Sequence, residues 1–453
     1  HSSVRWHKKE VEALTVETDS GKRVGMEAEF TEIDEGISYI GYEEAFNLVC
    51  SNLQPVGVEE TPLDSCVGRI VSEDLVALIS YPSTDISLKD GFAVRSEEVS
   101  AASLHQPVCL KVIGSAFAGS EFEGEVKRGS AVKICSGAPM PQGLNAVVSG
   151  EFCREASADE VWICADAEPG RNVLRSGGEI TSGSTIARRG EVLRPGCLGL
   201  AAAAGISRVR AYRRPRAALI GVGDEVISPG QHLLPNQLYA SNLVTIGAWL
   251  TSFGVPYVWS VVKDNEKAIK TELLKHLPSV DTILTSGGAW GSERDLVVGT
   301  LHGVGWREIF RNVRMGPGKG IAFGLLEGKP VFCLPGGPAS NEMAFLQIAL
   351  PGILRMGGRK RHPLATVSAR LTENVRGRHR AWTEFRDAEL SGDFNGGYTV
   401  TFYKSRSRLQ AIAYANCLVC IPEGTESLNQ GDIIPVQVLL PHVEDLGTGC
   451  RVD

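Results

Sequence analysis

Apolar and polar positions alternate with different periods along the chain, and each change of period marks a new segment. Apolar residues at helical spacing predict a helix over residues 38–51, and residues 64–77 are predicted as a helix-like or mixed segment. Residues 107–165 carry short β-type runs separated by Gly, Pro and Asn, which predict a small β domain. After Pro363 short alternating runs return and predict a C-terminal β barrel or sandwich.

Residues 215–357 have another rhythm, in which strand-like apolar runs alternate with helical patterns. This alternation predicts βαβ units around a mainly parallel sheet. The expected strands are Ala217 to Gly221, Tyr257 to Val262, Thr282 to Thr285 and Val331 to Leu334. The expected helices are Asn242 to Phe253, Glu266 to His276, Asp295 to His302 and Ser340 to Ile348.

Composition narrows the class of protein. The 453 residues, 43% of them hydrophobic, suit a soluble protein of roughly three domains. A net charge of −7 without a basic run disfavours nucleic acid, and the apolar stretches are too short to cross a membrane. Most of the 11 cysteines lie in apolar runs, which favours reduced thiols in the cytoplasm. Residues 1–12 are too polar for a secretory signal.

Glycine-rich polar loops follow three of the strands predicted for residues 215–357. Ligands collect at the carboxyl ends of the strands in an open α/β sheet, so these loops are expected to meet at one edge. In the middle loop, Ser286, Gly287 and Gly288 could hold a phosphate with bare backbone amides beside a helix start. The alternative is that the glycines only make tight connections.

Acidic residues in the same loops favour a divalent cation. Asp224, Glu293 and Asp295 would repel a phosphate unless a hard cation such as Mg²⁺ lay between them. The alternative for Asp224 is turn or helix capping. Lys319 could meet a phosphate, but its loop lacks the spacing of a P-loop. No Gly-x-Gly-x-x-Gly follows the first strand, which disfavours a dinucleotide dehydrogenase.

Seven segments in order and at matching spacing resemble the motif series of one family, the molybdopterin molybdenumtransferases of the MoeA and gephyrin E-domain kind. The segments are Gly68 to Asp74, Asp85 to Val94, Ser136 to Pro141, Arg213 to Arg216 with Gly223 to Glu225, Thr285 to Gly288, Pro317 to Lys319 and Leu334 to Gly336.

The resemblance implies a multidomain α/β plus β fold with a central MogA-like domain. Its parts would be an uncertain N-terminal extension (1–37), a discontinuous linker and dimerisation domain (38–85 with 171–211) and an inserted β domain (86–170). The molybdopterin-binding α/β domain (212–361) and a β-barrel domain (362–453) would follow. It also implies a homodimer, with molybdopterin adenylyltransferase and proteins that deliver cofactor to molybdoenzymes as partners.

The implied reaction inserts molybdenum from molybdate into adenylated molybdopterin and hydrolyses the adenylate to AMP with Mg²⁺. By residue-wise comparison the catalytic residues would be Asp90, Asp224 and Asp295, of which Asp224 and Asp295 would hold the metal. The substrate-binding residues would be Ser136, Ser286, Gly287, Gly288, Glu293, Lys319, Pro335 and Gly336.

Several positions depart from the family pattern and leave two alternatives open. They are Asn145 in place of Asp, Gly178 and Glu179 in place of Glu-Asp, Ala240 in place of Asp, Gly320 in place of Pro and Gly337 in place of Asn. Fewer acids imply weaker cation binding. The chain could therefore be a paralogue that binds pterin or acts as a scaffold, or an insertase that uses tungstate.

Overall fold

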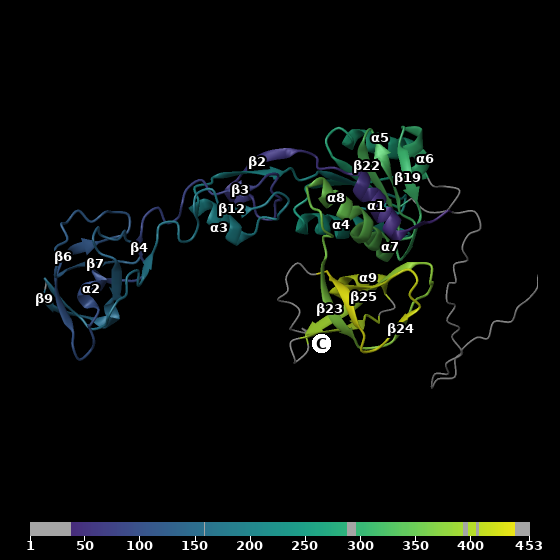
Figure 1. Cartoon of the computed structure of the whole chain (residues 1–453). Helices are drawn as coiled ribbons and strands as arrows, with labels where there is room; N and C mark the ends of the chain where they lie inside the picture. Colours follow the sequence, from purple (N-terminus) through teal and green to yellow (C-terminus); the bar gives the residue numbers. More distant parts are fainter. Residues whose placement is uncertain (1–37, 158, 288–295, 393–396, 405–406, 440–453) are drawn as a thin grey trace, which may run out of the picture. The chain divides into compact units, whose positions relative to one another are not determined.

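The computed structural model describes residues 38–157, 159–287, 296–392, 397–404 and 407–439 (Figure 1). The predicted N-terminal extension, residues 1–37, lies outside this part of the chain. Within the described residues no helix is long and apolar enough to span a membrane.

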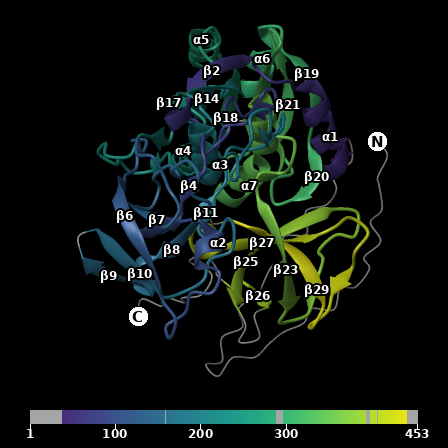
Figure 2. The same ribbon diagram turned by 60° about the vertical axis from the view of Figure 1, so that its left-hand side comes forward.

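A six-stranded sheet forms the centre of the α/β domain, in the order β17-β14-β18-β22-β21-β19 (Figure 2). The first four strands are parallel and match the predicted ones, namely β17 (Tyr257–Val262), β14 (Ala217–Val222), β18 (Thr282–Ser286) and β22 (Lys329–Leu334). The prediction of a mainly parallel sheet is confirmed. The two antiparallel strands β21 (Ala322–Leu326) and β19 (Arg307–Arg311) were not predicted from the sequence.

Alternate residues of these strands build two separate cores, because successive side chains in a strand point to opposite faces. On one face Leu219, Leu284 and Phe332 pack with helices α1 (Tyr42–Asn52), α4 (Ser241–Ser252), α7 (Pro338–Ala344) and α8 (Leu350–Met356), the last two joined by a π-helix over Phe345–Ala349. On the other face Ile220, Ile283 and Val331 pack with helices α5 (Glu266–His276) and α6 (Leu296–Gly303).

The inserted β domain is one sheet of six strands, as the short β-type runs predicted. The order is β8-β5-β7-β6-β10-β9. The elements are β5 (Gly91–Val94), α2 (Ser96–Val99), β6 (Val108–Ala116), β7 (Ser130–Ile134), β8 (Ala146–Ser149), a 3₁₀ turn (Gly150–Phe152), β9 (Cys153–Ser157) and β10 (Glu160–Ile163).

Two distant stretches of chain pair to make the linker domain. The paired strands are β2 (Val58–Pro62) with β13 (Arg208–Tyr212), β3 (Leu75–Val76) with β12 (Thr185–Ala187), and β4 (Ile86–Ser87) with β11 (Val173–Leu174). Helix α3 (Pro195–Ala203) completes a small core with Val71 and Leu193. The segment 64–77, predicted as helix-like or mixed, has only part of a 3₁₀ turn (Leu63–Ser65) and β3 as regular structure.

The C-terminal region contains a closed five-stranded barrel, which decides between the predicted barrel and sandwich. The ring runs β25-β26-β23-β29-β27 and closes by a second pairing of β27 with β25. Strands β1 (Ile40–Gly41) and β20 (Val313–Gly316) extend the sheet beyond β25. The other elements are β23 (Ala365–Leu371), β24 (Val375–Arg376), β25 (Thr383–Gly392), β26 (Tyr398–Phe402), α9 (Arg408–Tyr414), β27 (Cys417–Ile421), β28 (Ser427–Leu428) and β29 (Ile433–Val438).

The domain boundaries given above stay predictions. One element bears on them, because Ala45, Val49 and Leu53 of the segment assigned to the linker domain belong to the α/β core instead. Helix α1 thus serves the α/β domain, although more than 160 residues separate it from β14 (Asn52 to Ala217).

Candidate functional site

Three strands of the α/β sheet end in line, and their loops meet as the sequence predicted. Ser286 pairs in register with Gly221 on one side and with Leu334 on the other. The residue after β18, Gly287, donates its N–H to the Leu334 carbonyl at 3.3 Å. The loops after β14, β18 and β22 are therefore neighbours at one edge of the sheet.

The Ser286 hydroxyl is the centre of a polar network at this edge. Its Oγ accepts a hydrogen bond from Asn242 Nδ2 at 3.2 Å and another from Asn341 Nδ2 at 3.0 Å. The same two amide groups donate to backbone carbonyls, Asn242 to Gly336 and Asn341 to Pro335, each at 2.8 Å. Carbonyl acceptors fix which side of each amide is the NH₂ group.

These contacts determine what Ser286 can offer to a ligand. A hydroxyl has two acceptor lone pairs and one donor hydrogen, and both lone pairs of Ser286 are taken by amide donors. Its O–H is left as a donor. Because the side chain is almost buried and held from two sides, the donor is oriented before any ligand arrives.

Gly287 is required for steric reasons. Its φ is +94°, and a Cβ there would lie 2.4 Å from the Val222 carbonyl oxygen. The sequence predicted that the Gly287 amide would bind a phosphate, whereas in the structure this amide donates to the Leu334 carbonyl. Gly336 makes a second close approach, 3.7 Å from its Cβ position to the Gly287 Cα. Small residues at this edge let the three loops touch.

Only one of the predicted metal ligands lies in the described part of the chain. Asp224 is exposed after β14, and its Oδ1 accepts a hydrogen bond from the Asp264 amide at 3.3 Å. Gly288, Glu293 and Asp295 lie outside the described residues. No group of three or more His, Cys, Asp or Glu side chains that could hold a metal occurs among the residues the structure describes.

The Lys319 loop packs against helix α7, which follows the Pro335–Gly336 loop. Gly318 has φ of +111°, and a Cβ there would lie 3.2 Å from the Ala344 amide and 3.4 Å from the Ser340 carbonyl. Lys319 itself is half-buried. The Lys319 loop is therefore held against helix α7, which follows the third strand.

A second polar group belongs to the inserted β domain. Asp90 precedes β5 and Ser136 follows β7, and the antiparallel pairing of these strands brings both residues together. Asp90 Oδ1 accepts a hydrogen bond from the Ser136 amide at 2.7 Å, and both residues are exposed. The sequence predicted both residues, but their contact follows only from the strand register.

Two departures from the family pattern have structural roles. Asn145 holds the start of α2, because its Oδ1 accepts from the Ser96 amide at 2.8 Å and its Nδ2 donates to Ser96 Oγ at 3.0 Å. Ala240 precedes α4 and makes no side-chain cap to the helix. Four amides at the start of a helix have no partner within the helix, so this end of α4 carries partial positive charge without a neighbouring carboxylate cap.

Glu342, the residue after Asn341 on α7, is a buried acid. Trp249 Nε1 donates to its Oε1 at 2.7 Å. Burial raises the pKa of Glu342 to about 7, although the Trp249 hydrogen bond opposes the shift. A carboxyl group with such a pKa gains or loses its proton around neutral pH.

The sequence alone did not predict Asn242 and Asn341 as site residues. It placed both in predicted helices, and the signal that could have identified them is a polar amide near the start of each helix that follows a strand of the sheet. It also missed the Trp249–Glu342 pair, for which the chain separation of 93 residues leaves no local pattern.

Family models match the chain in three regions. They are described as MoeA N-terminal region (domain I and II) over residues 40–205, probable molybdopterin binding domain over 218–355, and MoeA C-terminal region (domain IV) over 369–439.

The chain is 31% identical over 386 residues to molybdopterin molybdenumtransferase 2 of Mycobacterium tuberculosis (strain CDC 1551 / Oshkosh), covering 83% of this chain and 93% of that protein. It is 32% identical over 396 residues to the molybdopterin molybdenumtransferase of Haemophilus influenzae, covering 84% and 94%.

Solved structures agree with these relatives. Two crystal structures of the molybdopterin biosynthesis MoeA protein from Pyrococcus horikoshii superpose with a TM-score of 0.73 each. The first is 30% identical and the match covers 89% of this chain and 100% of that one; the second is 24% identical and supports the fold alone.

Proposed function

Because this chain belongs to the MoeA family of molybdopterin molybdenumtransferases, we propose that it inserts molybdenum into molybdopterin in the biosynthesis of the molybdenum cofactor. The three family regions lie in order along the chain, and the match covers more than nine tenths of both named relatives. The substrates of this proposal are molybdate and molybdopterin in its adenylated form.

The observation that carries the proposal is the oriented Ser286 hydroxyl. A phosphate oxygen at this edge would accept its hydrogen bond, and hydrogen bonds to a charged group are about twice as strong as neutral ones. The uncapped start of α4 adds positive potential for the same anion. Both features suit the phosphate of the pterin side chain and the adenylate attached to it.

Mg²⁺ belongs to the proposal through Asp224. This carboxylate is exposed at the strand edge and accepts one backbone hydrogen bond, so oxygen lone pairs stay available for a hard cation. Asp295 would be the second ligand. When bound, the cation would neutralise phosphoryl charge and make a water more acidic.

The chain's own residues then have separate roles in the hydrolysis of the adenylate. Ser286 would hold an oxygen of the phosphate and stabilise the charge that develops as water attacks phosphorus and AMP leaves. Asp90, held in place by the Ser136 amide, would orient a water from the inserted domain by accepting its hydrogen bond. Lys319 would neutralise part of the charge.

We also propose a homodimer. Leu78 is 65% and Ile79 51% exposed in the linker domain, with Val76 and Tyr81 exposed close by in sequence. Neighbouring apolar side chains in water favour association with another surface. Sedimentation equilibrium of the full chain should give twice the monomer mass, and a monomer across the micromolar range would contradict this part of the proposal.

A single-turnover assay tests the activity. Purified protein with adenylated molybdopterin, Mg²⁺ and molybdate should release AMP and incorporate molybdenum, with AMP release dependent on molybdate. Ser286→Ala should slow AMP release by about 10- to 100-fold, since a hydrogen bond to a charged group is worth roughly 1.5–3 kcal/mol.

Ser252→Ala is the matched control, because Ser252 is an exposed serine on α4 that bonds only within its helix at Ala248. It should leave the rate unchanged. Pterin binding without AMP release at any Mg²⁺ and molybdate concentration would overturn the proposal in favour of a scaffold protein. Faster turnover with tungstate than with molybdate would overturn the choice of metal.

A further inference from the structure

A pocket of about 270 Å³ lies away from the Ser286 edge, among residues that the proposed activity does not use. Its walls come from the linker domain, from the turn after α1 and from the end of α8. The lining residues are Gln54, Pro55, Arg189, Gly190, Tyr212, Arg355, Gly358, Arg359 and Lys360.

The charge of this pocket is one-sided. Arg189, Arg355, Arg359 and Lys360 contribute four cationic side chains, and none of the described residues that line it is acidic. In the described part of the chain, none of these four forms an ion pair with a carboxylate. By contrast, nearby Arg69 and Arg213 pair with Glu59 and Asp281 respectively.

The side-chain contacts of these cations leave their charge largely uncompensated, although the Asp74 carboxylate accepts a hydrogen bond from the Arg189 backbone amide at 2.8 Å. Arg189 Nε donates to the Tyr212 hydroxyl at 3.2 Å, and Arg355 Nε donates to the Leu53 carbonyl at 3.3 Å. The Arg359 guanidinium lies 5.8 Å from the Phe253 ring centre, and burial lowers its pKa. Arg355 and Arg359 are half-buried, and holding them close to two further cations costs free energy, which a bound anion would offset.

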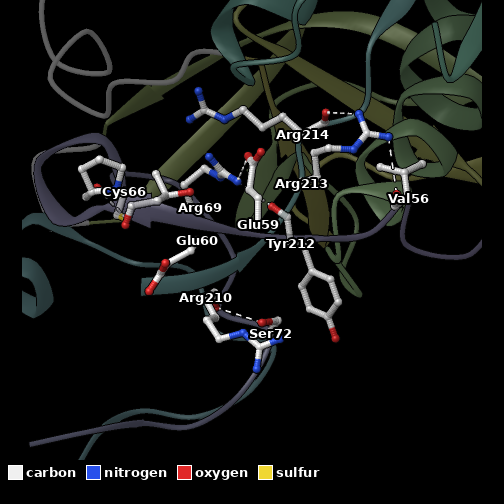
Figure 3. A network of polar contacts seen from close by, with 12 residues as sticks. Val56, Glu59, Glu60, Cys66, Arg69, Ser72, Arg210, Tyr212, Arg213 and Arg214 are labelled. Carbon is white, nitrogen blue, oxygen red and sulfur yellow. Dashed lines mark hydrogen bonds and ion pairs between the residues drawn. The ribbon is translucent and has the colours of Figure 1, made fainter. Parts of the chain in front are cut away.

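The walls of the pocket are fixed by close packing. Gly358 has φ of +90°, and a Cβ there would lie 2.3 Å from Tyr212 Cδ2, so only glycine fits against this ring. Figure 3 shows the strand that carries Tyr212 beside Arg69, Glu59 and Arg213, whose ion pairs and hydrogen bonds secure it. The Tyr212 carbonyl accepts from Arg69 Nη2 at 2.9 Å.

We propose that this pocket binds a small phosphate-bearing anion with at least two negative charges. Three guanidinium groups can each donate two parallel hydrogen bonds to oxygens of a phosphate group, and Lys360 adds a mobile positive charge at the exposed side. The volume accommodates a group larger than orthophosphate. The site is separate from the pterin edge and does not depend on the proposed insertion reaction.

Occupation of the pocket would join three stretches of chain that are far apart in sequence, because Gln54, Arg189 and Arg355 would share one ligand. A bound anion would therefore stabilise the packing of the linker strands against the end of α8. Thermal unfolding should detect this stabilisation as well as direct binding.

Isothermal titration of the full chain with inorganic pyrophosphate tests the proposal. The wild-type protein should bind it saturably, and R189Q/K360Q, which changes two exposed side chains, should weaken binding about tenfold or more, as expected for loss of charge-assisted hydrogen bonds. R355Q/R359Q, which changes the wall formed by the end of α8, should also weaken pyrophosphate binding about tenfold or more. It provides a second, independent test.

The matched control is K127Q/R128Q, which removes the same two charges from an exposed loop of the inserted domain. It should bind pyrophosphate as the wild type does. Titration with orthophosphate and with AMP separates a free phosphate from the phosphate of a nucleotide. No binding of any of the three to the wild type, or equal pyrophosphate affinity in R189Q/K360Q and in the control, would overturn the proposal.

Discussion

At the residue scale, Glu342 links the pH of the solution to the stability of the α/β domain. In the unfolded chain a glutamate ionises near pH 4.3, whereas burial raises the pKa of Glu342 in the folded protein to about 7. The folded state thus binds more protons between these values. The stability contributed by this group is present below the unfolded pKa and is lost as the pH rises through about 7.

Glu342→Gln should remove this dependence while keeping the Trp249 hydrogen bond, because glutamine retains an acceptor oxygen. At about pH 8 the free energy of unfolding should rise by roughly 1–3 kcal/mol, and at about pH 4 it should change little. Urea unfolding at both pH values measures this. Glu121→Gln, which changes an exposed acid in the inserted domain, should not alter the free energy of unfolding at either pH. An equal gain at both pH values for Glu342→Gln would contradict the explanation by burial.

The residue scale also shows where sequence reasoning stops. Ser286 could be selected from its place after a predicted strand, because that place follows from periodicity, whereas Asp90 and Ser136 were identified only through the family resemblance. The partners of Ser286 could not be selected. Asn242 and Asn341 meet at one hydroxyl only because helices α4 and α7 start beside the same edge of the sheet, which is a tertiary fact.

At the element scale, the ends of strands β14, β18 and β22 depend on the absence of a side chain at Gly287. Its positive φ is unfavourable for other residues by roughly 1–2 kcal/mol, and its Cβ position is too close to backbone to relax by rotamer changes. The strand ends would have to separate to accommodate a methyl group.

Gly287→Ala should therefore lower the free energy of unfolding by more than about 2 kcal/mol and should also impair AMP release. Thermal and urea unfolding measure the first effect. Gly299→Ala is the control, because Gly299 lies within α6 with open space around its Cβ position. That change should stabilise the protein by roughly 0.5–1 kcal/mol, so the same sign for both changes would refute the steric explanation.

Side-chain character explains why periodicity predicted some strands and missed others, with the exception of β21, an apolar run that was also missed. Strands buried on both faces, such as β14 and β22, are continuous apolar runs and were predicted within a few residues. Strands β19 and β25 mix charged and apolar residues because one face of each is partly exposed, and they were missed. The residues at which these two strands begin and end depend on the strands they pair with elsewhere in the sequence, β21 for β19 and β27 for β25.

At the scale of the whole molecule, one ion pair ties the linker strand to the α/β domain. Arg213 donates through Nη2 and Nη1 to the Asp281 carboxylate at 2.6 and 2.9 Å, and the Arg216 amide donates to it at 2.7 Å. Burial alone would raise the pKa of Asp281, but these hydrogen bonds hold it below its ordinary value. The stability from this carboxylate is present above its unfolded pKa and is lost as the pH falls through the folded value.

Asp281→Asn should reduce the free energy of unfolding by roughly 1–3 kcal/mol at neutral pH, because it leaves a half-buried guanidinium without its counter-charge. The deficit should shrink in acid as the wild-type carboxylate becomes protonated. The exposed pair Arg210–Glu73 is the matched case, and Glu73→Gln should change stability by less than about 1 kcal/mol. Equal effects of both substitutions would show that Arg213 and Asp281 do not hold the two regions together.

The early position of helix α1 has a consequence for the order in which the protein forms during translation. The six strands of the inserted domain lie within residues 91–163, so this sheet can close as soon as its own residues have left the ribosome. Helix α1 is made before it, yet the apolar face at Ala45 and Val49 finds its core only after strands β14 to β22 exist. The apolar residues of this segment therefore stay without their core until strand β22 has been made, and the segment is too short to be a stable helix before then.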